Sequence, residues 1–220
     1  MFNYGRCVVL EIKHRSSGKV LARLNKADSL AGRTINGVNL SGASFAGQSM
    51  QGVSFVSCNL TDADFSGCNL EKGRIQNSIL RRSNFSEASF DNANFSDSIF
   101  EVANFTNAKA KGARFRHAKL NGADCSHVDF SGSDFTFAEI RANFQRAILK
   151  DTNLYGADLS TGSFVYVEFA GANMTDAKII RADFTYAKME GCIGTNGKPW
   201  GSLAKKQPKK RWWGWNKAAL

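Results

Sequence analysis

Large apolar residues recur at every fifth position over most of this chain. The spacing starts at Ile35 and runs unbroken to Ile140, which gives 22 successive five-residue units, called cells here. It resumes at Phe144 and runs to Met189 for 10 more cells. A period of five matches neither the 3.6-residue repeat of an α-helix nor the two-residue alternation of a strand, so either element would scatter these side chains around its surface. The chain is therefore predicted to turn a corner in every cell.

A compact residue precedes most of the large ones by two positions, as at Ala63 and Ala123, and only Arg33 and Gln48 break this rule. A coil with four sides would point both residues of each pair inward and leave polar residues outside. Residues 20 apart should then stack. We call the large apolar residue of each cell its centre. Sorting the centres into four columns gives a phenylalanine column: Phe45, Phe65, Phe85, Phe105, Cys125, Phe144, Phe164 and Phe184. It also gives an aliphatic column: Leu40, Leu60, Leu80, Phe100, Leu120, Ile140, Leu159 and Ile179.

The period slips once, between Ile140 and Phe144, where three residues stand in place of four. Ala142 keeps the compact inward position, and Phe144 still falls in the phenylalanine column. We interpret the slip as the deletion of one outward residue at a corner and predict a kink or a tightened turn there. Tolerated drift without functional meaning is the alternative.

Individual cells resemble the A(D/N)LXX motif of the pentapeptide-repeat family, for example ADFSG at 63–67, ANFSD at 93–97, ANFTN at 103–107 and GADLS at 156–160. The resemblance covers about three quarters of the chain. It implies an all-β fold, a right-handed quadrilateral β-helix of about eight coils. With neighbouring rungs about 4.8 Å apart, such a rod would be on the order of 40 Å long.

Three segments follow from this pattern. Residues 30–193 form the repeat region. Residues 1–29 are predicted to be an amino-terminal cap, because residues 6–24 alternate as a β-hairpin around a glycine-containing turn and the open end of a solenoid needs covering. Residues 194–220 form a basic, tryptophan-rich carboxy-terminal tail that contains both prolines and all four tryptophans.

The formal net charge of +10 lies at the ends of the chain. Residues 1–29 contain 6 basic residues (Lys and Arg) and 2 acidic ones (Asp and Glu), residues 30–193 contain 16 and 17, and residues 194–220 contain 7 and none. No apolar run could span a bilayer and no signal peptide is recognisable, so the protein is predicted to be cytoplasmic. The five scattered cysteines favour small buried residues over disulfides or a zinc site.

The sequence offers little for catalysis. His117 and His127 fall two residues after a centre on different sides of the coil, so they are predicted to be solvated rather than to form a metal pair. Aspartates directly before a centre, such as Asp64 and Asp124, fit turn residues that accept hydrogen bonds from nearby amides better than paired acid and base groups. We predict a protein that is not an enzyme and that needs no cofactor or metal.

Two surfaces are candidates for binding a partner. The first is a pair of neighbouring charged belts, for which mutual neutralisation between rungs is the alternative: Glu87, Asp91, Asp97, Glu101, Lys109, Lys111, Arg114, Arg116 and Lys119. The second is the tail, which could cap the rod, pair two rods in a homodimer, bind an anionic membrane or a nucleic acid, or remain disordered: Trp200, Lys205, Lys206, Lys209, Lys210, Arg211, Trp212, Trp213 and Trp215.

The leading functional hypothesis is a rigid protein-interaction scaffold with an unidentified protein partner. Some quinolone-resistance members of the pentapeptide-repeat family resemble DNA in width and charge and bind type II topoisomerases, which gives the main alternative. That mimicry needs a strongly negative surface, and the near-neutral repeat region disfavours it. The third hypothesis is an adaptor tethered to a membrane or a nucleic acid by the tail.

Overall fold

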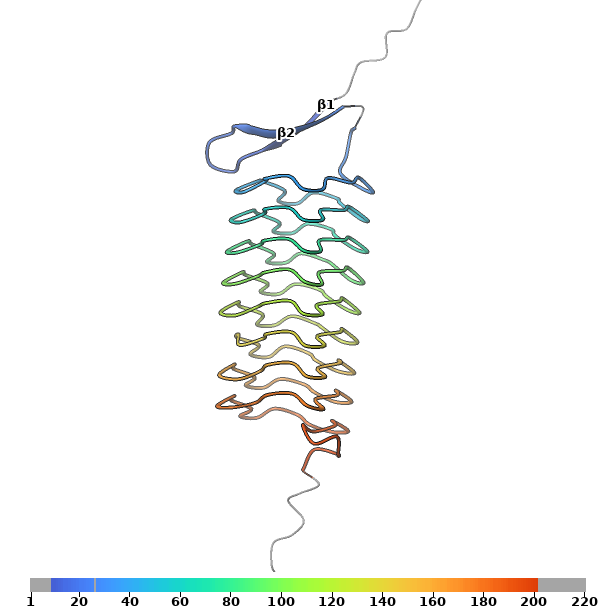
Figure 1. Ribbon diagram of the computed structural model, residues 1–220, viewed down its shortest axis with the longest axis vertical. Helices are drawn as coiled ribbons and strands as arrows, with labels where there is room; N and C mark the ends of the chain where they lie inside the picture. Colours follow the sequence, from blue (N-terminus) through green and yellow to red (C-terminus); the bar gives the residue numbers. More distant parts are fainter. Residues whose placement is uncertain (1–8, 26, 202–220) are drawn as a thin grey trace, which may run out of the picture.

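The computed structural model, which describes residues 9–25 and 27–201, is a stack of coils with a hairpin at one end (Figure 1). The hairpin consists of β1 (Val9–Lys13) and β2 (Val20–Asn25). Along the stack, parallel bridges join the outward residue before each large apolar residue to its equivalent in the next coil, from Thr34↔Ser54 to Asn173↔Ile193. The partners are 20 residues apart outside the slip, so the predicted coil length is confirmed.

A turn closes each side of the coil. At a typical corner the N–H of Ala88 donates to the carbonyl of Phe85 at 3.1 Å, and Glu87 between them has a φ of 59°. This left-handed conformation recurs two residues after the centres, and Val102, Phe137 and Tyr166 adopt it although bulky side chains rarely do. The stack tolerates such residues because hydrogen bonds between coils hold the corner on both sides.

Asp and Asn residues before the centres stabilise these turns. The Oδ1 atoms of Asp64 and Asp124 each accept a hydrogen bond from the backbone N–H two residues later, at 3.0 Å. The prediction that these carboxylates serve the turns is confirmed, and their regular spacing along the rod has a structural cause.

The interior is filled by the predicted columns. Phe65 stacks on Phe45 at a centroid distance of 4.8 Å and on Phe85 at 4.6 Å, and Phe85 stacks on Phe105 at 5.1 Å. All four rings are fully buried. The column on the opposite side is also aromatic in its middle coils, where Phe115 stacks on its neighbours above and below at 4.8 and 5.1 Å.

One corner carries a buried polar column that the sequence analysis did not predict. The Ser78 hydroxyl donates to the Phe55 carbonyl at 2.8 Å and accepts the N–H of Cys58 at 3.0 Å. Ser98 repeats the arrangement in the next coil along the chain, accepting the N–H of Ser78 at 3.1 Å. Each hydroxyl therefore satisfies a backbone amide of the preceding coil, which explains why serine replaces alanine at these inward positions.

The slip is a deletion of one corner residue, as predicted. Bridges across it join residues 19 apart, such as Asp124↔Asn143, and the spacing returns to 20 at Asn143↔Ser163. Ala142 stays buried, and a bend without a left-handed residue replaces the regular turn. The Arg141 guanidinium lies across this corner, 3.0 Å from Glu139 and 3.7 Å from Asp158.

The two ends of the stack differ. The hairpin lies across the first coil (Figure 1), where the N–H of Arg15 donates to the Gly42 carbonyl and the N–H of Ser44 to the Lys13 carbonyl, both at 2.8 Å. At the other end, residues 193–200 fold back through an Ile193↔Pro199 bridge, and the N–H of Trp200 donates to the Cys192 carbonyl at 2.8 Å.

Candidate functional site

The interior of the described coils is filled mainly by apolar side chains. Among the described residues, no group of His, Cys, Asp and Glu side chains is arranged to hold a metal ion, and every buried side-chain polar atom has a hydrogen-bond partner. In the same part of the chain there is no helix with the length and apolar character needed to cross a membrane. Candidate sites must therefore be sought on the outer surface and at the ends.

The histidines are dispersed. His117 and His127 are exposed at different corners, as predicted. His14 lies in the hairpin turn, where its Nδ1 atom accepts hydrogen bonds from the backbone N–H groups of Ser16 and Ser17. The imidazole packs on Gly42, which leaves no room for a side chain there.

Burial makes the described cysteines chemically inert. Cys58, Cys68, Cys125 and Cys192 are buried and unpaired. Desolvation raises the pKa of the Cys68 thiol and of the Cys192 thiol to about 11, so neither forms a thiolate at neutral pH. The prediction of small buried residues is confirmed for these four, and Cys7 lies outside the described residues.

The charged belts encircle the rod. Glu87 and Asp97 follow centres on opposite sides of the same coil and so lie at opposite corners. The two belts meet at Asp91, whose carboxylate accepts the backbone N–H of Lys111 at 2.8 Å. The belts thus offer a ring of charges around two coils instead of one continuous face.

Basic residues of the belt pair mainly with acids of the following coil. Salt bridges join Lys111 to Asp129 at 3.2 Å, and Lys119 to Glu139 at 3.3 Å. A longer pair joins Arg116 to Asp134 at 3.7 Å. In the described part of the chain, four belt residues have neither an ion-pair partner nor a side-chain hydrogen bond: Glu87, Asp97, Lys109 and Arg114.

A first aromatic ladder, called the His–Phe–Tyr ladder here, follows one corner. The His117 imidazole stacks on the Phe137 ring at a centroid distance of 5.6 Å, and Phe137 meets the Tyr155 ring edge to face at 5.5 Å. The Asp176 carboxylate of the next coil accepts the Tyr155 hydroxyl and raises the pKa of that phenol. Phe137 covers Gly156, where a Cβ atom would collide with its ring.

A second ladder, the Arg–Tyr ladder, follows the opposite corner nearer the carboxy-terminal end. Tyr166 and Tyr186 stack at 4.8 Å, and the Arg146 guanidinium lies 5.7 Å from the centre of the Tyr166 ring. The tyrosines are 50% and 69% exposed. Tyrosine and arginine are among the residue types most enriched at protein interfaces, and here they lie side by side on an exposed surface.

Sequence reasoning did not single out these ladders. Their signal is nevertheless present, because Tyr166 and Tyr186 are 20 residues apart and each falls two positions after a centre. Sorting the outward positions into columns, as was done for the inward ones, would have revealed the pair.

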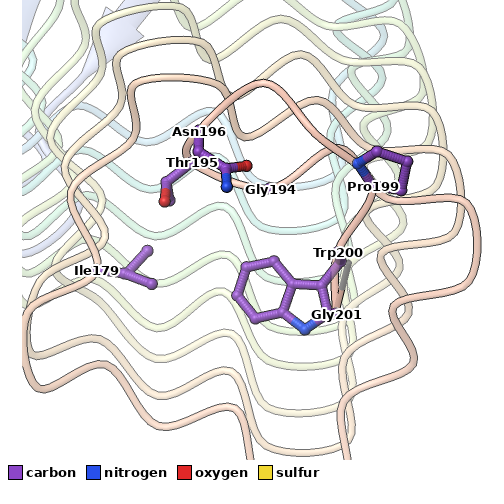
Figure 2. A pocket seen from close by; sticks show the side chains of 7 residues that line it. All are labelled: Ile179, Gly194, Thr195, Asn196, Pro199, Trp200 and Gly201. Carbon is purple, nitrogen blue, oxygen red and sulfur yellow. The ribbon is translucent and has the colours of Figure 1, made fainter. Parts of the chain in front are cut away.

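The carboxy-terminal end contains a pocket of about 190 Å³. Figure 2 shows Ile179 and the Trp200 indole on opposite sides of it, with Thr195 and Asn196 at its edge. Trp200 packs on Phe184 at a centroid distance of 5.7 Å. Trp200 is thus the one predicted tail contact within the described residues, and the others, from Lys205 to Trp215, lie outside them.

Comparisons with known structures found several pentapeptide-repeat proteins. HetL, from the cyanobacterium Nostoc sp. strain PCC 7120 and involved in heterocyst differentiation regulation, is 22% identical over 77% of this chain and 92% of its own, with a TM-score of 0.28. QnrB1, a plasmid-mediated fluoroquinolone resistance protein, is 19% identical over 74% and 93%, with a TM-score of 0.45. A protein from the Arabidopsis thaliana thylakoid lumen is 35% identical over 43% and 59%, with a TM-score of 0.25.

A comparison with functionally curated protein sequences found no significant match. The family profile described as "Pentapeptide repeats" matches in 8 copies, over residues 39–76, 74–101, 98–136, 140–164 and 163–193. These segments include nearly all of the stacked coils and resume at the slip. The chain therefore belongs to the pentapeptide-repeat family.

Proposed function

We propose that this protein is a rigid interaction scaffold without enzymatic activity. The observation that carries the proposal is the construction of the rod, in which a filled interior and hydrogen bonds between coils fix the outward side chains in straight columns. Such columns present the same spacing to a partner with little loss of conformational entropy on binding. The same construction fills the interior of the described coils with side chains.

The Arg–Tyr ladder is the proposed centre of the partner surface. Its rings are exposed, while stacking already restricts their rotamers, so binding would bury apolar area with little further ordering. The unpaired belt residues Glu87, Asp97, Lys109 and Arg114 are a second proposed contact. Because these four surround the rod, a partner that approaches from one side would touch only some of them.

The test is a partner-binding comparison. A partner is first captured by cross-linking to the full-length chain and then purified, and its affinity is measured for three proteins. Replacing Tyr166 and Tyr186 with Ser should weaken binding by about 30-fold, as expected when hot-spot aromatic residues are removed. The matched control replaces Ser86 and Thr106 with Ala at the same corner and should bind normally. Equal affinities for the ladder variant and the control would refute this surface, and failure to find any saturable protein partner would refute the scaffold.

One face of the rod gives the topoisomerase alternative a specific basis. The outward positions before the phenylalanine column carry no lysine or arginine: Ser44, Asp64, Asn84, Asn104, Asp124, Asn143, Ser163 and Asp183. Three carboxylates spread over eight coils are a weak imitation of a DNA backbone, so this function ranks second. Inhibition of DNA supercoiling at stoichiometric protein, lost when Asp64 and Asp124 are changed to Lys, would reverse the order.

The hairpin is proposed to cap the amino-terminal end. Ile12 of β1 is 2% exposed and belongs to the same core cluster as Leu30 and Ile35 of the first coil. Replacing Ile12 with Asp should uncover these residues and lower the melting temperature, whereas the same change at the exposed Val9 should have little effect.

A further inference from the structure

The carboxy-terminal end of the rod is less well covered than the amino-terminal end. Leu30, Ile35, Leu40 and Phe45, in the first coil, are at most 5% exposed. In the last coil the centres Ile179, Phe184 and Met189 are only partly buried. Ile180 and Tyr186 beside them are both 69% exposed. The last coil therefore leaves several large apolar side chains partly or largely exposed near the end of the stack.

The described chain covers only part of this end. Trp200 packs over Phe184, and its backbone bond to Cys192 fixes the indole there. The pocket remains between that indole and Ile179 (Figure 2). An apolar pocket bounded by an indole and an isoleucine suits another flat apolar side chain.

The chain itself supplies such side chains. Gly201 lines the pocket and is the last described residue, and Trp212, Trp213 and Trp215 follow within 14 positions. The 11 residues from Gly201 to Trp212 can reach about 36 Å when extended, which is ample for any position at the end of the rod. A segment tethered at this distance has an effective concentration on the order of millimolar. A second copy of the chain would have to compete with that concentration.

We propose that the distal tail (residues 202–220) is an intramolecular cap, in which an indole of Trp212, Trp213 or Trp215 occupies the pocket between Ile179 and Trp200. Apolar contact holds the cap, because the described charged residues near this end that form no salt bridge are balanced: Asp176, Asp183 and Glu190 stand against Lys178, Arg181 and Lys198. The cap therefore responds weakly to salt.

The test uses the full-length chain labelled with 5-fluorotryptophan, whose four resonances are assigned by single Trp→Phe substitutions. Docking predicts that at least one distal-tail resonance shows no H₂O/D₂O isotope shift and keeps this protection over about a hundredfold dilution, because an intramolecular equilibrium is independent of concentration. Thr195→Lys, at the pocket edge, should abolish the protection. Thr106→Lys makes the same charge change at mid-rod and should preserve it.

Several results would overturn the proposal. Isotope shifts on all three distal resonances mean that no cap forms, and protection lost on dilution means that a second copy fills the pocket. If a distal-tail resonance loses its isotope shift only when phosphatidylglycerol vesicles or DNA are added, the tail binds a membrane or a nucleic acid instead of the pocket. Protection that survives in a folded Thr195→Lys protein places the indole elsewhere.

Melting of tail variants gives a second measurement that leaves the pocket intact. Replacing Trp212, Trp213 and Trp215 with Ser should lower the melting temperature. The matched control replaces Lys205, Lys209 and Lys210 with Ser and should leave it unchanged. Equal melting of the two variants would contradict the apolar cap.

Discussion

Replacing Phe85 with Ala tests the packing of the core. Phe85 is fully buried and stacks between Phe65 at 4.6 Å and Phe105 at 5.1 Å, with the edges of Phe95 and Phe100 at 6.0 and 5.9 Å. Replacing a buried Phe with Ala costs about 3–5 kcal/mol, which includes both the lost burial and the cavity, and the two stacked pairs that Phe85 makes favour the upper half of that range. Backbone bonds between coils hold the neighbours in place, so the void cannot collapse. We expect the free energy of unfolding to fall by about 4–5 kcal/mol, near the upper end of the range for Phe→Ala.

The assay is urea unfolding followed by far-UV circular dichroism, with hydrogen exchange as a second probe because solenoids can unfold coil by coil. Ser86→Ala is the control, since the Ser86 hydroxyl makes no hydrogen bond and its loss should change stability by less than about 0.5 kcal/mol. A similar midpoint for both variants would refute the assignment of inward and outward positions. A loss for Phe85→Ala below about 2 kcal/mol would show that the coils do collapse into the void.

Three further results are expected. Inserting one glycine between Arg141 and Ala142 restores the left-handed corner position and should leave the melting temperature unchanged or raise it. If the inserted protein failed to fold, the shortened corner would be required by the fold. In a Cys7→Ser protein the buried thiols should not react with Ellman's reagent at neutral pH until urea is added, and rapid reaction of any of them would contradict their burial. Lys150 and Lys188 lower the pKa of Glu168 to about 2 from 4.5. Its stabilising effect is thus complete above pH 4.5 and is lost as the pH falls towards 2. The melting temperature of the Glu168→Gln variant should therefore depend less steeply on pH in that window than that of the unchanged chain. Identical dependences of melting temperature on pH would argue against the ion pairs.

Much of the fold was predictable because a coil of this kind leaves few choices inside. Each five-residue cell turns one corner, so the position of a residue in its cell decides whether it points inward, and its position modulo 20 decides its column. Even the slip could be interpreted, because Ala142 and Phe144 keep the inward order on either side of the lost residue. The prediction of turn-capping aspartates succeeded for the same reason, since the interaction spans only two residues.

The surface was less predictable. An outward side chain has neighbours above, below and beside it, and its rotamer selects among them. The belt residue Lys111 could have paired with Asp91 of the preceding coil, yet its ammonium pairs with Asp129 of the following coil. Ser78 and Ser98 look like ordinary compact residues in the sequence, and only the stacked backbone shows that their hydroxyls replace turn hydrogen bonds.

The sequence by itself thus determined the coil, its four columns and the deletion, because these depend on periodicity and on the limited volume of the interior. The tertiary structure alone decided which charges pair, which aromatic residues stack into ladders, and that a pocket remains between Ile179 and Trp200. These features depend on the rise from coil to coil and on side-chain rotamers, which residue spacing does not encode.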